Sequence, residues 1–300
     1  MSPSTGTSLG ESLAMDFSLE KLTKDLKKAA YTLSRDEAAF LVDSYYNMQK
    51  LRMATGAQSR ELLDASKPHE VLAWFNRNNE GLEKQVAKEL DVYSNRFVLG
   101  RWARSQYGIG PVIAAGLLAT IDFQKLDETG KEIWRCETCG DIWRFAGLDP
   151  TSKWEKGQKR PHNAFLKTLC WKIGESFLKT INREEDVYGH VLMARKEWET
   201  ARNEAFAYRE QAAEILKRVP THKQKAVYAT GMLPAGHILQ RSKRYAVKLF
   251  LSHFHHVGYS LKFGVEPPKP YILNQPNHTH FITPPNWPMI EDVSGLDLLP

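Results

Sequence analysis

An apolar helix entered through a tight glycine turn is encoded by Tyr107-Gly108-Ile109-Gly110-Pro111-Val112-Ile113-Ala114-Ala115-Gly116-Leu117-Leu118-Ala119-Thr120-Ile121. Two glycines around one aliphatic residue allow a turn with positive φ and leave bare backbone N–H groups at the start of the next helix. Such a helix end suits an anion of the size of a phosphate. Pro111 fits the first helical turn, and Ala114 and Gly116 keep the helix thin enough for close packing. The stretch predicts a helix-hairpin-helix that grips nucleic-acid backbone, with the Ile109 side chain packed inward.

Helical spacing of apolar residues extends from this turn in both directions. A capping-box sequence, Ser34-Arg35-Asp36-Glu37, opens one helix, and no strand-like alternation occurs before residue 100. Further helices are predicted near 68–77 and 80–106, from 141 to a stop at Gly147, and over 163–180. Residues 122–142 are predicted to form a polar connection. Two long helices, 184–218 and 237–263, are predicted to form an antiparallel hairpin.

We therefore predict a mainly α fold in five parts. These are a disordered N-terminus (1–14), a helical region (15–95), a helix-hairpin-helix module (96–182), a long helical hairpin (183–264) and an extended proline-rich tail (265–300). Seven prolines between residues 267 and 288 forbid regular structure in that tail, so we expect it to lie over a surface or a partner.

The positive charge is concentrated in the middle and C-terminal parts of the chain. The 300 residues carry a formal net charge of +6, and 42% of them are hydrophobic, enough to build a globular core. Residues 1–95 hold 12 Lys and Arg against 14 Asp and Glu, whereas no acidic residue occurs between Glu214 and Glu266. This distribution favours a polyanionic partner.

Features of secreted and membrane proteins are not evident. The first residues lack the charged and apolar regions of a secretory signal, and three cysteines do not make a disulfide framework. The longest apolar run, 109–121, is too short to span a bilayer. We expect an intracellular protein, cytoplasmic or nucleoid-associated, without a membrane partner.

Two further basic segments are candidate nucleic-acid contacts. The first is a loop with Trp154 and Gly157 among its cations, followed by a helix on which Asn163 and Lys167 share one face; its cations are Lys153, Lys156, Lys159 and Arg160. The second is the face of the last long helix that carries Arg241, Lys243, Arg244 and Lys248. The alternatives are a solvated loop and a surface helix that packs through its apolar residues.

Cysteine and histidine patterns raise the question of a metal. Cys136 and Cys139 form half of a zinc site, which Cys170, His162 or His190 would complete only by folding back; the alternative is a loop with free thiols. His253 and His256 share a helix face from which His255 points away, without an acidic residue nearby. For these histidines we predict packing or backbone contacts instead of metal binding.

The ordered motifs resemble a known family. Gly108-Ile-Gly-Pro-Val-Ile-Ala-Ala-Gly-Leu-Leu is followed by Trp143-Arg-Phe-Ala-Gly-Leu-Asp-Pro150, by a basic loop with Lys156-Gly157 and Arg160, and by the helix that starts Asn163-Ala-Phe-Leu-Lys-Thr. Over residues 105–180 this series resembles the C-terminal domain of insertion-sequence transposases of the DEDD class. The resemblance implies binding of DNA, and of a guide RNA in some members. It also implies strand cleavage and exchange by a RuvC-like domain with four acidic residues, N-terminal to the matching region.

The chain departs from this family in two places. Its N-terminal third shows no apolar strand that ends in Asp, and the family's serine nucleophile has no counterpart in Arg160-Pro161-His162-Asn163. The leading hypothesis is therefore a DNA-binding protein that acts in transposition or recombination or derives from such a protein. A second is an active transposase or recombinase with an unrecognised or partner-supplied metal site, which requires a sheet with clustered Asp and Glu in residues 1–100. A third is an assembly protein that forms homo-oligomers through residues 184–263. The choice between DNA and RNA stays open.

Overall fold

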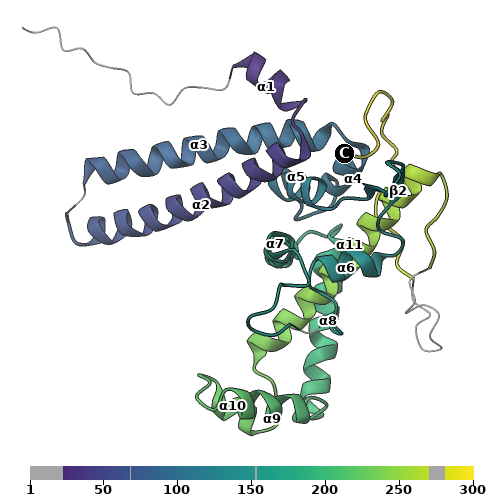
Figure 1. The fold of residues 1–300 in the computed structure, drawn as a ribbon. Coiled ribbons are helices and arrows are strands. Elements are labelled where there is room, and N and C mark those ends of the chain that lie inside the picture. The colour runs from purple at the N-terminus through teal and green to yellow at the C-terminus, as the bar shows by residue number, and fades with distance from the viewer. Residues whose placement is uncertain (1–22, 68, 153, 270–280) are drawn as a thin grey trace, which may run out of the picture.

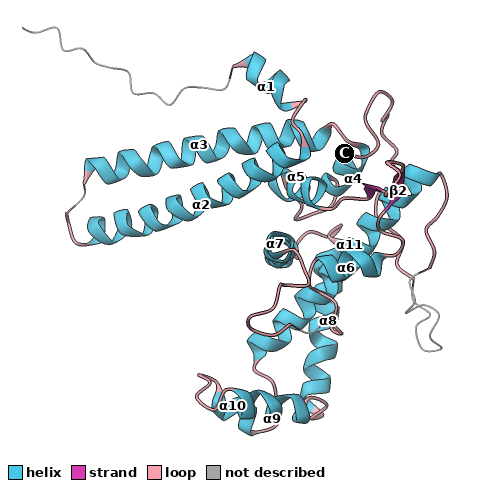
Figure 2. Cartoon of the chain, in the orientation of Figure 1, coloured by secondary structure: helices cyan, strands magenta, loops and turns pink. Residues whose placement is uncertain are grey.

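The computed structural model describes residues 23–67, 69–152, 154–269 and 281–300, which form eleven helices and one small sheet (Figures 1 and 2). The helices are α1 (Lys24–Ala30), α2 (Arg35–Asp64), α3 (Glu70–Asn95), α4 (Val98–Arg104), α5 (Pro111–Thr120), α6 (Cys139–Phe145), α7 (Ala164–Thr180), α8 (Val187–Glu204), α9 (Arg209–Arg218), α10 (Lys225–Ala229) and α11 (Ala235–Phe263). Strands β1 (Gln124–Leu126) and β2 (Glu132–Trp134) pair antiparallel within the predicted polar connection. The mainly α fold is confirmed. The predicted disordered segment, 1–14, lies outside the described residues.

Local signals in the sequence set several helix ends as predicted. The capping box forms at α2, where the Ser34 side chain accepts from the Glu37 N–H and the Glu37 carboxylate accepts from the Ser34 N–H. Pro111 occupies the first turn of α5. Gly147, with φ of +66°, follows the end of α6, and Gly264 ends α11 in the left-handed conformation.

Helix α5 lies at the centre of the core. Seven of its ten residues are buried, and it packs against α2, α3, α4 and α7. A Cβ atom at Gly116 would lie 2.9 Å from the Leu169 side chain of α7 and 3.4 Å from the Val42 side chain of α2. The absence of a side chain at this position therefore lets α5 approach two helices at once, as the small residues of α5 predict.

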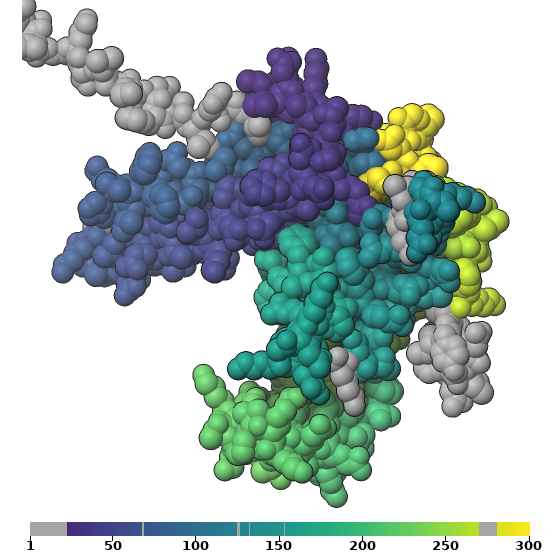
Figure 3. All heavy atoms as spheres, viewed as in Figure 1, coloured from purple at the N-terminus to yellow at the C-terminus, as the bar shows by residue number. Residues whose placement is uncertain are grey.

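The antiparallel pair α2 and α3 forms an arm that projects from the rest of the molecule (Figures 1 and 3). In α2 only Ala38, Val42 and Thr55 are buried, and a 2.6 Å ion pair between Arg52 and Glu83 joins the two helices. Large apolar side chains stay exposed along the arm: Phe40, Leu51, Met53, Leu63, Val71, Trp74, Phe75 and Leu82. The arm is thus tied to the core mainly at its base, beside α5.

The predicted helices near 68–77 and 80–106 are wrong in their boundaries. Helix α3 runs without a break to Asn95, and the chain is interrupted at Arg96 and Phe97 before α4. The backbone N–H groups of Val98 and Leu99 donate to carbonyls of residues 297 and 298 in the C-terminal segment. Because a distant segment supplies these acceptors, local periodicity could not locate the interruption.

The predicted helix 184–218 is also divided. It ends at Glu204, Phe206 adopts φ of +57°, and α9 turns back toward α10. This reversal buries Tyr208 and Ala212 in a second small cluster with Tyr228, Leu233 and Ile238. The side chain of Asn203 fixes the corner, since it donates to the Leu233 carbonyl and accepts from the Leu233 N–H, both at 2.8 Å. Helices α8 and α11 do pack antiparallel, with α9 and α10 at one end of the pair (Figure 1).

The described part of the C-terminal tail, residues 281–300, lies across α4 and the base of α3. The Trp102 indole N–H donates to the Pro285 carbonyl at 2.8 Å, and Arg96 pairs with Asp297 at 2.6 Å. Trp287, Met289 and Leu299 pack against the main core. We call this segment the C-terminal strap. In the described parts of the chain, no helix combines the length and apolar character that crossing a bilayer requires.

Buried histidines of α11 connect the core to this strap. The His253 side chain is 3% exposed; its Nδ1 lies 2.8 Å from the Tyr188 hydroxyl oxygen and its Nε2 lies 2.8 Å from the Ile282 carbonyl oxygen. His255 Nε2 lies 2.8 Å from the Cys136 carbonyl oxygen. Both side chains therefore make the packing and backbone contacts that the sequence predicts. Burial lowers the pKa of His253 to about 4 and lowers that of His255 as well.

The pH dependence of stability tests the state of His253. Its lowered pKa means that the unfolded chain binds more protons than the folded chain below pH 6.5, so stability falls as the pH falls. We expect His253 to remove about 3 kcal/mol of unfolding free energy between pH 7 and pH 4. Urea denaturation of wild type and His253→Gln across this range measures the effect. The variant should lose much of the dependence and keep the part due to other groups with shifted pKa values, His255 among them; an unchanged pH slope would refute the assignment.

Candidate nucleic-acid interface

The turn between α4 and α5 is docked on the C-terminal half of α7. Gly108 has φ of +84°, and a Cβ atom there would lie 3.0 Å from the Phe177 ring. The Ser176 hydroxyl donates to the Gly108 carbonyl at 2.6 Å. The Ile109 side chain is 4% exposed, which confirms its predicted inward packing, and its N–H donates to the Gln106 carbonyl. The fold therefore requires glycine at the first of the two positions.

Gly110 differs from Gly108. Its φ of −83° is open to any residue, and an added Cβ atom would meet nothing within 4 Å. Gly110 is the N-cap residue of α5 and has no side chain that could accept a hydrogen bond. The backbone N–H groups of the first helical turn therefore receive no capping bond from a side chain. A shallow hollow of about 530 Å³, lined by residues 104–110, opens at this place. The fold therefore does not require glycine at position 110, and the start of α5 stays open to solvent.

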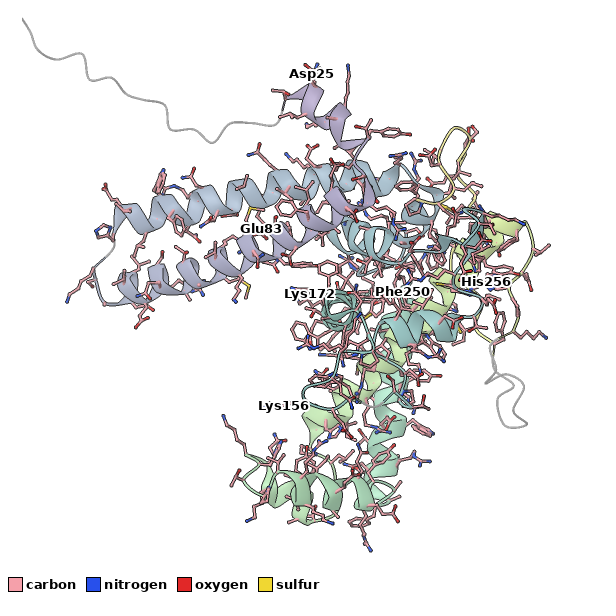
Figure 4. All side chains as sticks on the ribbon, in the orientation of Figure 1. Asp25, Glu83, Lys156, Lys172, Phe250 and His256 are labelled. Carbon is pink, nitrogen blue, oxygen red and sulfur yellow. The ribbon has the colours of Figure 1, made fainter. Side chains whose placement is uncertain are left out.

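The basic loop, residues 151–161, exposes its described cations. Lys156, Lys159 and Arg160 are exposed, and Figure 4 places Lys156 between α7 and the end of the molecule formed by α9 and α10. The Arg160 guanidinium lies 5.7 Å from the centre of the Trp154 ring, whose indole N–H donates to the Gln158 carbonyl. Lys153 lies outside the described residues. Among the residues described, no carboxylate pairs with the three cations.

The loop is anchored at both ends by hydrogen bonds within the fold. At its start, Asp149 accepts from the N–H and the hydroxyl of Thr151. At its end, the Asn163 N–H donates to the Phe145 carbonyl at 2.9 Å. The Asn163 side-chain oxygen accepts from the Leu166 N–H and so caps α7. This oxygen is used within the fold, which argues against Asn163 as a primary ligand contact.

The glycine turn and the basic loop lie at opposite ends of α7. The loop leads into α7 at Ala164, whereas the turn contacts Ser176 and Phe177. At 1.5 Å per residue these ends are separated by about 18 Å along the helix. The two predicted contacts thus meet α7 at different places along its length. A single phosphate cannot reach both, although a nucleic-acid strand of a few nucleotides can.

A basic cleft opens between α7, α10 and α11. The cavity measures about 490 Å³, and none of its lining residues is acidic. Its polar and aromatic lining includes Lys167, Trp171, His222, His237, Gln240 and Arg244. Lys167 and Arg244 are exposed and, within the described structure, have no ion-pair partner. The cleft therefore combines one predicted cation without an ion-pair partner from each of the two basic segments.

The remaining cations of the α11 face have internal partners. Arg241 pairs with the buried Glu199 at 2.8 Å, and Lys243, itself 5% exposed, pairs with Glu175 at 2.6 Å. Lys248 lies 4.0 Å from the centre of the Trp143 ring. Arg241, Lys243 and Lys248 thus make contacts within the fold, and Arg244 alone of the four lines the cleft without such a partner. The polyanion-binding face of α11 stays a prediction from the sequence.

The cysteine pair is buried. Cys136 is 7% and Cys139 is 6% exposed, and burial raises the pKa of Cys136 to about 11. Among the described residues, no group of three or more His, Cys, Asp or Glu side chains could hold a metal ion. The zinc site stays a prediction from the sequence.

Sequence reasoning missed four members of the cleft: Trp171, His222, Tyr228 and His237. They are separated by up to 66 positions, and α9 and α10 must fold back before the group forms. The signal that pointed toward them was the absence of acidic residues between Glu214 and Glu266, which leaves this whole wall of the cleft without negative charge.

Comparison with family models, curated proteins and solved structures finds no match for this chain. The resemblance to transposases consequently depends on the sequence motifs alone.

The two neighbouring cations of α11 are expected to differ in their effect on stability. Lys243→Met should lower the free energy of unfolding by about 1–2 kcal/mol, because it leaves the partly buried Glu175 unpaired. Arg244→Met should change it by less than about 0.5 kcal/mol, because its head group has no internal ion pair. Urea denaturation at constant pH compares the two variants. Equal destabilisation would contradict the structural role given to Lys243.

Proposed function

We propose that this chain binds the backbone of nucleic acid, with DNA as the ligand, through the surface around the N-terminal half of α7. One observation carries the proposal: five cations surround this half of the helix, and none has a carboxylate partner in the described structure. They are Lys156, Lys159, Arg160, Lys167 and Arg244. Surface cations without an ion-pair partner attract phosphates by charge, and their contacts carry little sequence information.

The glycine turn supplies a second backbone contact in this proposal. It lies about 18 Å away along α7, farther than one phosphate reaches, so the turn and the loop would contact different phosphates of the same duplex. The open space at Gly110 and the uncapped start of α5 let a phosphate approach the backbone there. The turn and the loop would thus hold one duplex at two places along α7.

The resemblance to the transposase C-terminal domain supports this assignment and suggests a role in transposition or recombination, or descent from such a role. For strand cleavage the structure offers no corresponding support. The catalytic hypothesis requires a sheet with clustered Asp and Glu in residues 1–100, and the described residues from 23 to 100 form helices and one isolated bridge at Phe97. We therefore propose binding and not cleavage. Self-association through residues 184–263 stays a prediction from the sequence.

Salt-dependent binding tests the proposal. With five phosphate contacts, affinity for a fluorescein-labelled 20-base-pair duplex should fall on the order of 10²- to 10³-fold between 50 and 200 mM salt. The double variant Lys156→Glu/Lys159→Glu should bind at least about 10-fold more weakly and show a salt slope smaller by about 2. Fluorescence anisotropy measures both quantities.

Lys50→Glu/Lys88→Glu is the matched control, because it makes the same charge change on exposed positions of the α2–α3 arm. It should bind like wild type apart from a small effect of net charge. Absence of binding at 50 mM salt, or equal affinities for the two double variants, would overturn the proposal.

A further inference from the structure

The basic cleft has features that a surface for intact duplex backbone does not need. It is a cavity of about 490 Å³ instead of a flat basic patch, and this volume lies in the range of sites that enclose small ligands. Four of its lining side chains, Trp171, His222, Tyr228 and His237, carry flat rings. Phosphates alone require cations, whereas flat aromatic surfaces in such a cavity suit a planar ligand.

Trp171 is the platform in this cavity. The side chain is 55% exposed, although its neighbour Cys170 is buried in the core. Exposure of a large indole to water costs hydrophobic free energy, which a ligand that covers the ring would recover. Lys167 precedes it by four residues and therefore lies beside it on the same face of α7. A cation and an exposed ring are thus adjacent on one wall.

The opposite wall supplies a second cation and neutral hydrogen-bonding groups. Arg244 and Gln240 come from α11. His237 Nδ1 lies 3.4 Å from the Tyr228 hydroxyl oxygen, and burial together with the Arg244 and Arg241 charges lowers the pKa of His237. His222 Nδ1 accepts from the Gln224 N–H, which leaves its Nε2 as the protonated donor. Hydrogen-bond donors and acceptors of this kind suit the polar edge of a base.

From this arrangement we infer that the basic cleft binds one unpaired nucleotide of a single-stranded DNA segment, with the base stacked on Trp171 and the phosphate held by Lys167 and Arg244. A paired base does not present its face to a protein, because its neighbours in the stack cover it. An unpaired base does, and stacking on an aromatic side chain is tolerant of sequence. The inference deepens the proposed function, since it names the form of DNA that this part of the same surface takes.

The test compares one tryptophan substitution on two ligands. Trp171→Ala should weaken binding of a labelled single-stranded oligodeoxythymidylate of 12 nucleotides by about 5- to 100-fold. It should leave the affinity for a labelled 12-base-pair duplex within about 2-fold of wild type, because the loop and the turn contact the duplex backbone. Trp171→Phe keeps a ring and should restore most of the single-strand affinity. Fluorescence anisotropy measures all of these affinities, and circular dichroism checks that each variant is folded.

Trp74→Ala is the matched control. Trp74 is exposed to a similar extent, 47%, but lies on the α2–α3 arm, so both affinities should stay at the wild-type value. If Trp171→Ala leaves single-strand binding unchanged, or weakens single-strand and duplex binding equally, the inference fails. Duplex binding that still depends on salt and on Lys156 and Lys159 would then preserve the proposed function, so the two failures are distinguishable.

Discussion

The close approach of α5 to α2 and α7 at Gly116 is the constraint on which the rest of the structure depends. On one side, Val42 belongs to the base of the α2–α3 arm; on the other, Leu169 belongs to the helix that organises the candidate interface. A side chain at Gly116 would push one of these helices away, since packed interiors hold little spare volume. The arm, the glycine turn and the basic loop are consequently positioned relative to one another by a single thin helix.

The cations divide into those paired within the fold and those without a partner at the surface, and this division determines which of them can contact a ligand. Arg241 and Lys243 stand close together in the sequence with Arg244, yet the first two meet Glu199 and Glu175. Carboxylates that are buried or partly buried need such partners, because an unpaired charge in the interior is costly. The net charge of the chain therefore overestimates how many cations can contact phosphates. The cations around α7 that have no ion-pair partner are a better measure of that number.

Sequence reasoning succeeded where structure is decided by neighbouring residues and failed where a distant segment decides it. The capping box at Ser34, the helix start at Pro111, the stop at Gly147 and the helix that follows Asn163 all depend on short-range chemistry. The interruption before α4 and the corner after α8 depend on partners about 30 to 200 residues away. The same holds for the site. Exposure of Lys156 and Lys159 could be expected from a polar loop, whereas the pairing of Lys243 and the assembly of Trp171 with His237 could not.

The C-terminal strap has a consequence for the order in which the chain folds. The Trp102 indole and the Pro285 carbonyl are 183 residues apart, and the first amides of α4 find their acceptors only at residues 297 and 298. During synthesis, a ribosome that adds about 5–20 residues per second delivers these partners tens of seconds at most after α4 has emerged. Contacts of such high sequence separation form late, because the entropy of closing the loop opposes them. Until then, the Trp102 indole N–H and the first backbone N–H groups of α4 lack their hydrogen-bond acceptors. A nascent chain therefore passes through a stage in which this part of its core is exposed to solvent.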